Sequence, residues 1–409
     1  MNNARSWLGL AAMAALLLAC SKDKNLEKPT ELTEFASTAK VERVWSASVG
    51  SGAPRLRTGL EIATAGELVF AANHKGMVYA FDRATGKRKW DTNTKLQLTG
   101  GPGAGEGLVV AGASHGAIVA LDAATGEVRW KAQINSEILA GPTIANQVVL
   151  LRTTDGRVSA LAAADGKLLW SAEQQVPRLS LRGTTRPAVA GTLAVSGFDN
   201  GRVLALQLAD GATVWDANVS PAAGRTELDR LNDIDAAVEV AGSDIFAVAY
   251  QGKAVRIDRD TGQVLWSRDV SSYSGLALDE DSVYITGADG SLVKIGRRNG
   301  VEAWKQSVLS RRRLSAPAML GEYVAVGDYD GYVHFFDRAT GTLAARNRPF
   351  RDGVSAPLVA SGDTVFALDG KGKLVALRVK ALAVPAAAPA PTPTPVPAPT
   401  PAAVPPTEQ

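Results

Sequence analysis

The chain has 409 residues, of which 46% are hydrophobic, and its 44 basic residues nearly balance 41 acidic ones to leave a net charge of +3. This balance gives no basic footprint for binding nucleic acid. The single cysteine excludes an internal disulfide and any metal cluster held by cysteines.

The first 19 residues are typical of a secretory signal peptide. Arg5 precedes an apolar run, Trp7–Leu18, that is short for a transmembrane span. The run ends in Leu-Leu-Ala-Cys, which resembles a bacterial lipobox, where the signal is removed before a cysteine that then carries lipid. We therefore predict that Cys20 is lipidated and that its acyl chains anchor the protein to a membrane, since each buried methylene contributes about 0.8 kcal/mol. The alternative is an ordinary signal peptide whose cysteine has no role.

The residues after the cysteine extend this prediction. By the same resemblance, Ser21 in place of an aspartate favours the outer membrane of a Gram-negative cell, with the protein on its periplasmic side. Residues 20–40 are polar and charged with little periodicity, which predicts a flexible tether between lipid and folded domain.

Most of the chain consists of a repeated unit. Its clearest copy, Gly116–Trp130, reads GAIVALDAATGEVRW: an apolar strand, an aspartate, a turn with Gly126, and a strand that reaches a tryptophan. The leading glycines of the eight units are Gly76, Gly116, Gly156, Gly201, Gly252, Gly290, Gly331 and Gly372. The first six units have a tryptophan fourteen residues after that glycine, whereas the seventh has Ala345. A period near 40 residues with several short strands per unit predicts β-propeller blades.

The remaining strands complete an all-β, eight-bladed β-propeller over residues 41–380. Short apolar runs such as Leu108–Ala111 precede the leading glycines, as expected for inner strands covered on both faces. The eighth unit stops at Val379 without a tryptophan strand, and Val41–Val49 supplies one, so the N-terminal strand is predicted to close the ring. We expect the repeated tryptophans to be structural and to lie between blades.

A residue followed by proline precedes several of the inner strands, and such a proline can begin a strand. These pairs are Gly141-Pro142, Arg186-Pro187, Ala316-Pro317 and Ala356-Pro357.

The C-terminal residues 381–409 hold ten of the chain's 20 prolines. This composition predicts a disordered, extended tail outside the propeller, with a reach of tens of ångströms at about 3.1 Å per residue. We favour an extension without a fixed partner over a spacer or a ligand for another envelope component.

Two of the steps between leading glycines are longer than the rest, at 45 and 51 residues. The extra residues follow a tryptophan, so they lie in connections between blades, where insertions often mark a binding face. The first connection contains PRLSLRGTT (Pro177–Thr185), with leucines between arginines, and the second contains TELDRLNDIDA (Thr226–Ala236), with four acidic residues. A basic-apolar loop beside an acidic loop predicts a protein-binding surface. The alternatives are solvated or helix-capping aspartates, or a calcium site that lacks the usual glycine.

These motifs resemble the BamB family. SLRG, DNGRV at Asp199–Val203 and TELDRLNDID, within a lipobox-led eight-bladed chain, are similar to these outer-membrane lipoproteins of the β-barrel assembly machinery. The resemblance covers about Cys20 to Lys380 and leaves out the Pro-rich tail. It implies that both connections dock on the periplasmic polypeptide-transport-associated domains of BamA, the barrel subunit. The contact residues carried across by motif are Leu179, Leu181, Arg182, Asp233 and Asp235.

An enzyme is the alternative function. Quinoprotein dehydrogenases use the same Trp-repeat propeller to house pyrroloquinoline quinone, typically with an adjacent cysteine pair and a calcium ion, and this chain has no second cysteine. His74, His115 and His334 occupy different positions of the repeat, so they form no repeated ligand ring or triad, and we expect them at the surface or in turns. We therefore predict no catalytic residue, no metal and no cofactor.

Two weaker hypotheses remain. Unfolded outer membrane protein clients would pair with exposed strand edges by β-augmentation. A general envelope scaffold would touch anionic headgroups through Arg311–Arg313, a run that we instead expect to be a solvated rim.

Overall fold

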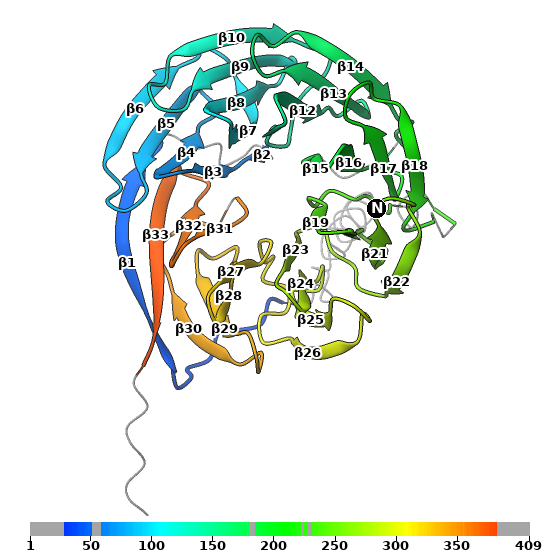
Figure 1. Cartoon of the computed structure of the whole chain (residues 1–409). Coiled ribbons are helices and arrows are strands. Elements are labelled where there is room, and N and C mark those ends of the chain that lie inside the picture. The colour runs from blue at the N-terminus through cyan, green and yellow to red at the C-terminus, as the bar shows by residue number, and fades with distance from the viewer. Residues whose placement is uncertain are drawn as a thin grey trace, which may run out of the picture.

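The computed structural model describes residues 28–50, 59–177, 179, 185–221, 225–226, 231–354 and 356–382. All regular structure in these residues is β-strand, and the strands form eight sheets set around a central axis (Figure 1). The predicted all-β, eight-bladed propeller is confirmed. Among the described residues, the chain has no helix with the length and apolarity needed to span a bilayer.

Each blade is an antiparallel sheet whose strands follow one another from the axis outward. From the inner strand to the outer, blade 1 consists of β3 (Ile62–Ala65), β4 (Leu68–Ala72), β5 (Met77–Asp82) and β6 (Arg88–Asn93), blade 2 of β7 (Leu98–Gly105), β8 (Leu108–Ala113), β9 (Ala117–Asp122) and β10 (Val128–Gln133), and blade 3 of β11 (Thr143–Ala145), β12 (Val148–Arg152), β13 (Arg157–Ala162) and β14 (Leu168–Glu173). In the same order, blade 4 consists of β15 (Ala188–Ala190), β16 (Leu193–Gly197), β17 (Arg202–Gln207) and β18 (Thr213–Asn218), blade 5 of β19 (Glu239–Ala241), β20 (Asp244–Val248), β21 (Ala254–Asp258) and β22 (Val264–Arg268), and blade 6 of β23 (Gly275–Leu278), β24 (Ser282–Thr286), β25 (Leu292–Gly296) and β26 (Glu302–Gln306). Blade 7 consists of β27 (Ala318–Leu320), β28 (Tyr323–Gly327), β29 (Val333–Asp337) and β30 (Leu343–Asn347), and blade 8 of β31 (Val359–Ser361), β32 (Thr364–Leu368), β33 (Lys373–Ala381) and β1 (Ala39–Ser48). The short strand β2 (Gly59–Leu60) adds to blade 2, parallel to β7.

The core lies between blades rather than at one centre. The second strand of each blade is an apolar run that neighbouring blades cover on both faces; every residue of β12 and β16, for example, is buried. Eight hydrophobic clusters of this kind follow one another around the ring.

Tryptophans connect a blade to the next at seven of the eight blade boundaries, all except that between blades 7 and 8, and we call each such contact a joint. The indole N–H donates to a backbone carbonyl in the outer turn of the following blade at 2.7–3.3 Å. The donor and acceptor pairs are Trp45–Arg83, Trp90–Ala123, Trp130–Ala163, Trp170–Leu208, Trp215–Arg259, Trp266–Arg297 and Trp304–Arg338. Glycine is required in that turn: Gly262 has φ +73°, and a Cβ there would lie 2.7 Å from the Trp215 ring. The prediction that the tryptophans are structural is confirmed.

The N-terminal strand closes the ring, as predicted. Strand β1 pairs antiparallel with β33, and Trp45 lies opposite Ala376. The outer strands of blade 8 therefore come from the two ends of the chain, and no turn joins them. This explains Ala345 in the seventh unit, because a tryptophan there would have no turn to receive it; Ala345 is buried among apolar residues of blades 7 and 8 instead.

The predicted flexible tether over residues 20–40 needs a correction in its described part. Strand β1 begins at Ala39, and residues 30–38 lie along blade 7. Thr30 N–H donates to the Ser310 carbonyl at 3.0 Å, and Arg312 Nη1 donates to the Thr30 carbonyl at 3.0 Å. Backbone hydrogen bonds and a buried arginine hold this segment, which a reading of polarity alone does not reveal. Cys20, the signal peptide and the tail after residue 382 lie outside the described residues.

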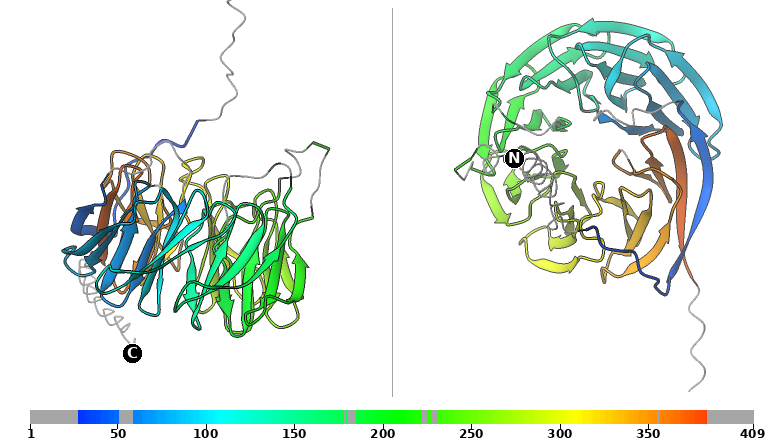
Figure 2. Two further views of the ribbon diagram at one scale, coloured as in Figure 1. Left: turned by 90° about the horizontal axis from the view of Figure 1, so that it is seen from above. Right: turned by 180° about the vertical axis from the view of Figure 1, so that it is seen from behind.

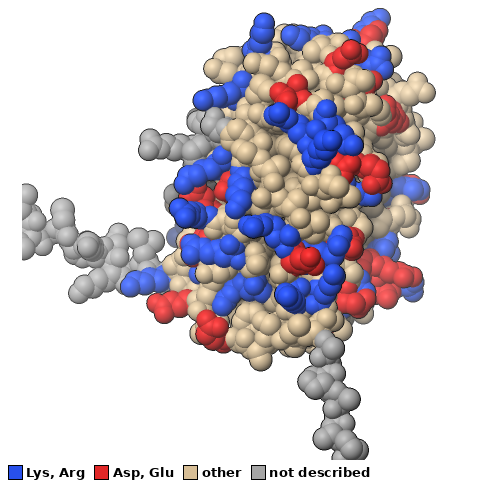
Figure 3. All heavy atoms as spheres, turned by 90° about the vertical axis from the view of Figure 1, so that its left-hand side faces the viewer, with Lys and Arg blue, Asp and Glu red and all other residues tan. Residues whose placement is uncertain are grey.

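Basic and acidic side chains lie close together on the side of the ring formed by β1 and β6 (Figure 3). Lys380 pairs with Glu42 at 3.4 Å, and Arg88 pairs with Asp91 at 3.3 Å. Ion pairs of this kind offset the positive charge locally, in keeping with the small net charge of the chain.

Candidate docking surface

The two long connections lie on the same face of the ring. One runs from β14 to β15 and the other from β18 to β19, so each leads from the outer strand of a blade to the inner strand of the next. Figure 2 (left) shows the ring edge-on, so that its two faces lie above and below the strands. The described ends of these connections therefore form neighbouring parts of one surface.

In the described part of the first connection, an apolar side chain is exposed to solvent. Leu179 is 41% exposed, which fits its predicted role as a contact residue. Leu181 and Arg182 lie outside the described residues. At its end this connection turns inward: Thr185 is buried, and its hydroxyl donates to the carbonyl of Ile234 in the second connection.

The second connection is packed into the ring more deeply than its composition predicts. Ile234 is fully buried, and its N–H donates to the Phe198 carbonyl at 3.2 Å. Asp233 is 0% exposed, and its carbonyl accepts from Tyr250 N–H at 2.9 Å. The structure thus places Asp233 inside the fold rather than on the surface, because its apolar neighbour Ile234 fills the space between blades 4 and 5. Asp235 is half-buried and lines a cavity instead of packing between blades.

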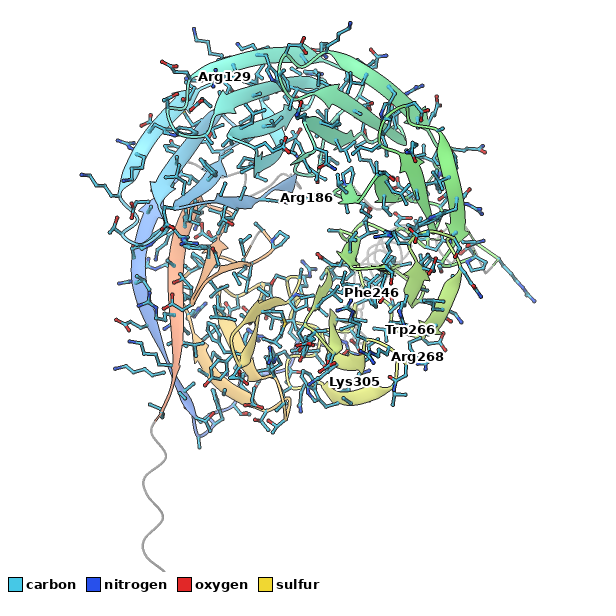
Figure 4. All side chains as sticks on the ribbon, viewed as in Figure 1. Arg129, Arg186, Phe246, Trp266, Arg268 and Lys305 are labelled. Atoms are coloured by element: carbon cyan, nitrogen blue, oxygen red, sulfur yellow. The ribbon has the colours of Figure 1, made fainter. Side chains whose placement is uncertain are left out.

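Asp235 lines a cavity of about 380 Å³ where the central channel opens on this face. We call it the channel-mouth cavity and define it by its charged and aromatic side chains, which are Glu61, Arg186, Asp235, Glu239 and Tyr273. These residues stand just before or at the start of the inner strands of four blades. They converge because inner strands begin at the axis; Figure 4 places Arg186 at the central opening of the ring.

Acidic side chains outnumber basic ones in the wall of the channel-mouth cavity. Arg186 of blade 4 reaches past Gly141 of blade 3 and forms an ion pair with Glu61 of blade 1. Burial raises the pKa of Glu239 to about 7, and Arg186 opposes this shift only in part. Glu239 is thus opposed only by a guanidinium that already pairs with Glu61.

One arginine and one histidine depart from the predictions made for them. His334 and Arg312 are both buried rather than at a surface or a solvated rim. His334 Nε2 lies 3.0 Å from Asp328 Oδ2, and Arg312 Nε donates to the same oxygen at 2.7 Å. Burial lowers the pKa of His334, while Asp328 opposes that shift. This network fixes blade 7 and the N-terminal segment that crosses it.

A metal site has no support in the described part of the chain, where no three His, Cys, Asp or Glu side chains are grouped to hold an ion. The charged pairs there are ion pairs or turn caps. Asp82, for example, accepts from Thr85 in its turn, and that hydrogen bond is the largest cause that lowers the pKa of Asp82 to about 2.

Comparison with known proteins identifies the family. The family model described as "Outer membrane protein assembly factor BamB" matches residues 29–96, 74–306 and 288–384. The chain belongs to the BamB family. The Pseudomonas aeruginosa member is 45% identical over 372 residues, which cover 91% of this chain and 98% of the relative. The member from Alkalilimnicola ehrlichii is 42% identical over 92% of this chain and 97% of its own length.

Solved structures agree with this assignment. BamB from Moraxella catarrhalis superposes with a TM-score of 0.76 at 29% identity, over 83% of this chain and all of that one. A quinohemoprotein alcohol dehydrogenase from Comamonas testosteroni has a TM-score of 0.65 at 14% identity, over 83% of this chain and 76% of that one, which shows a shared fold alone. The chain is thus a BamB-type outer membrane protein assembly factor with the propeller architecture that quinoproteins share.

Of the channel-mouth residues, Asp235 was predicted from sequence as a partner contact, whereas Glu61, Arg186, Glu239 and Tyr273 were not predicted as site residues. Arg186 carried a signal, because it stands before proline where other units have a glycine or alanine, at Gly141, Ala316 and Ala356. Glu239 carried none, since a single glutamate at the start of a strand resembles any surface residue.

Proposed function

We propose that this protein is a non-catalytic scaffold lipoprotein of the outer membrane β-barrel assembly machinery. It is anchored through Cys20 on the periplasmic side and docks on the periplasmic domains of BamA. In this role it assists the folding and insertion of outer membrane proteins. Membership of the BamB family supports the role at the outer membrane.

One observation carries the choice of docking face. The two long connections are joined to each other through Thr185 and Ile234, and Leu179 stands exposed beside them. An exposed apolar side chain is typical of a residue that anchors a protein interface. In this proposal Leu179, Leu181, Arg182 and Asp235 face BamA. Asp233, which is buried, holds the second connection in place.

The quinoprotein alternative rests on fold resemblance alone. Dehydrogenases share the propeller at 13–17% identity, and fold does not determine function.

Binding to the periplasmic domains of BamA from the same cell tests the docking face. The mature protein with Cys20→Ser is compared with Leu179→Ala and with a matched control, Leu265→Ala. Leu265 is 43% exposed but lies on the outer strand β22. We expect Leu179→Ala to weaken binding by about tenfold, as for an interface anchor, and Leu265→Ala to leave it unchanged. Equal binding by both variants would show that the interface lies elsewhere on the ring.

The lipid anchor is tested in the native host. Cys20→Ala is expected to shift the protein from the membrane fraction to the soluble periplasmic fraction and to remove the acyl mass from its N-terminus. A membrane fraction unchanged by Cys20→Ala would contradict anchoring through this residue.

A further inference from the structure

The channel-mouth cavity has a chemistry that the docking loops alone do not explain. It opens on the docking face and holds about 380 Å³ of space, enough for a side chain with a long stem. Its walls combine three carboxyl groups, one guanidinium and the ring of Tyr273 with apolar surface from Leu276, Pro317 and Pro357.

Charge in the cavity is unbalanced. The Arg186 guanidinium already pairs with Glu61, and a hydrogen bond from Gly141 N–H adds to that carboxylate at 3.4 Å. The Glu239 carboxyl group has no hydrogen bond to another described residue, and burial raises its pKa to about 7. A half-buried carboxylate without a donor is costly, and a second cation beside it would remove that cost.

Tyr273 adds an independent feature. It lies in the same wall, 36% exposed, and its ring meets Tyr250 edge-on at 6.1 Å between centroids. An aromatic ring beside carboxylates is a common arrangement for binding guanidinium and ammonium groups. The apolar part of the wall suits the methylene stem that such a group carries.

We propose that the channel-mouth cavity receives one basic side chain, arginine or lysine, of the docking partner, with Glu239 as its counter-ion and Tyr273 beside it. A side chain fits better than a free cation because the second long connection runs directly into the wall of the cavity. Asp235 and Glu239 lie at the end of that connection, so a partner seated on the face reaches the opening. This inference rests on the proposed function and specifies the chemistry of its partner.

The first test uses a small probe with a neutral counterpart. The mature full chain with Cys20→Ser is titrated at pH 8 with a capped Gly-Arg-Gly peptide and with the same peptide containing citrulline. We expect binding of the arginine peptide only, weakened about tenfold by Glu239→Gln through loss of a charge-assisted hydrogen bond. The control Glu42→Gln, on the outer strand β1, leaves binding unchanged. For the wild type, binding is weaker at pH 6, where Glu239 is protonated.

The second test uses the partner itself. Glu239→Gln is expected to weaken binding to the BamA periplasmic domains by about tenfold while Glu42→Gln has no effect. If the wild type binds BamA, yet Glu239→Gln binds equally well, the inference is wrong and the proposed function stands. Binding of the peptide without any effect on BamA would assign the cavity to a free cation and would also overturn the inference. No binding of BamA by the wild type would overturn the proposed function.

Discussion

Each joint between blades uses the same contact, whereas the channel mouth uses each of its charged side chains once. At a joint, an indole packs on a glycine and donates to a carbonyl of the next turn, and seven blades repeat this arrangement. At the channel mouth, Arg186 crosses from blade 4 to blade 1 and Glu239 lacks a donor. The joints hold neighbouring blades together, whereas the charged side chains at the channel mouth are not needed to hold the ring closed. The difference separates what serves the fold from what is open to a partner.

Removing one joint has the largest expected effect. Trp215→Ala deletes a buried indole from the cluster between blades 4 and 5 and leaves a cavity. We expect it to lower the free energy of unfolding by about 3–5 kcal/mol, measured by urea denaturation. The matched control is Val214→Ala, one residue away and 47% exposed, which should change stability by less than about 0.5 kcal/mol. Similar losses of unfolding free energy for both variants would show that the joints contribute no more to the stability of the ring than exposed residues do.

Adding a joint where the chain has none should also destabilise the ring. A tryptophan in place of Ala345 would match the repeat, but blade 8 has no turn to receive it, and Ala345 is packed within the cluster of blades 7 and 8. Ala345→Trp is therefore expected to cost about 1–3 kcal/mol in free energy of unfolding. Thr342→Trp, on the exposed part of the same hairpin, is the control. A gain in stability for Ala345→Trp would contradict our explanation of the missing tryptophan.

Two glycines of blade 5 separate backbone conformation from packing at a joint. Gly242 and Gly262 have similar φ values, +66° and +73°, but a Cβ at Gly242 meets nothing within 4 Å, whereas one at Gly262 meets Trp215. Alanine at either position costs about 1–2 kcal/mol for the left-handed backbone. We expect Gly262→Ala to cost about 1 kcal/mol more, because the indole must move. Equal losses of unfolding free energy in urea denaturation would mean that the Trp215 side chain can move aside at no energetic cost.

The same comparison decides how far sequence reasoning reached. Repetition made the joints visible: tryptophans fourteen residues after the glycines predicted the blades, and Val41–Val49 predicted the closing strand. Residues that occur once offered no such check. Asp233 was expected to face a partner, yet it is buried because Ile234 beside it fills an inter-blade space.

Blade 7 shows the same limit. His334 and Arg312 were expected at the surface, and both are buried against Asp328. A charged side chain is assigned to solvent by default from sequence, since the partner that permits its burial lies elsewhere in the chain. Neither the docking of residues 30–38 on this blade nor the convergence of Arg186 and Glu61, which are 125 residues apart, follows from local pattern.

A change of pH tests the channel mouth without any partner. Burial raises the pKa of Glu239 from 4.5 to about 7, so between these pH values the native protein holds a proton that the unfolded chain releases. The free energy of unfolding that protonated Glu239 contributes is therefore fully present below about pH 4.5 and is lost as the pH rises to about 7. Glu239→Gln removes the titration while keeping the shape of the side chain. The thermal midpoint of Glu239→Gln relative to wild type should thus be higher at pH 8 than at pH 5, with Glu42→Gln showing no such change. A difference that stays constant between the two pH values would mean that the Glu239 carboxylate is already compensated in the free protein, and the cavity would then have no unmet charge to offer a basic side chain.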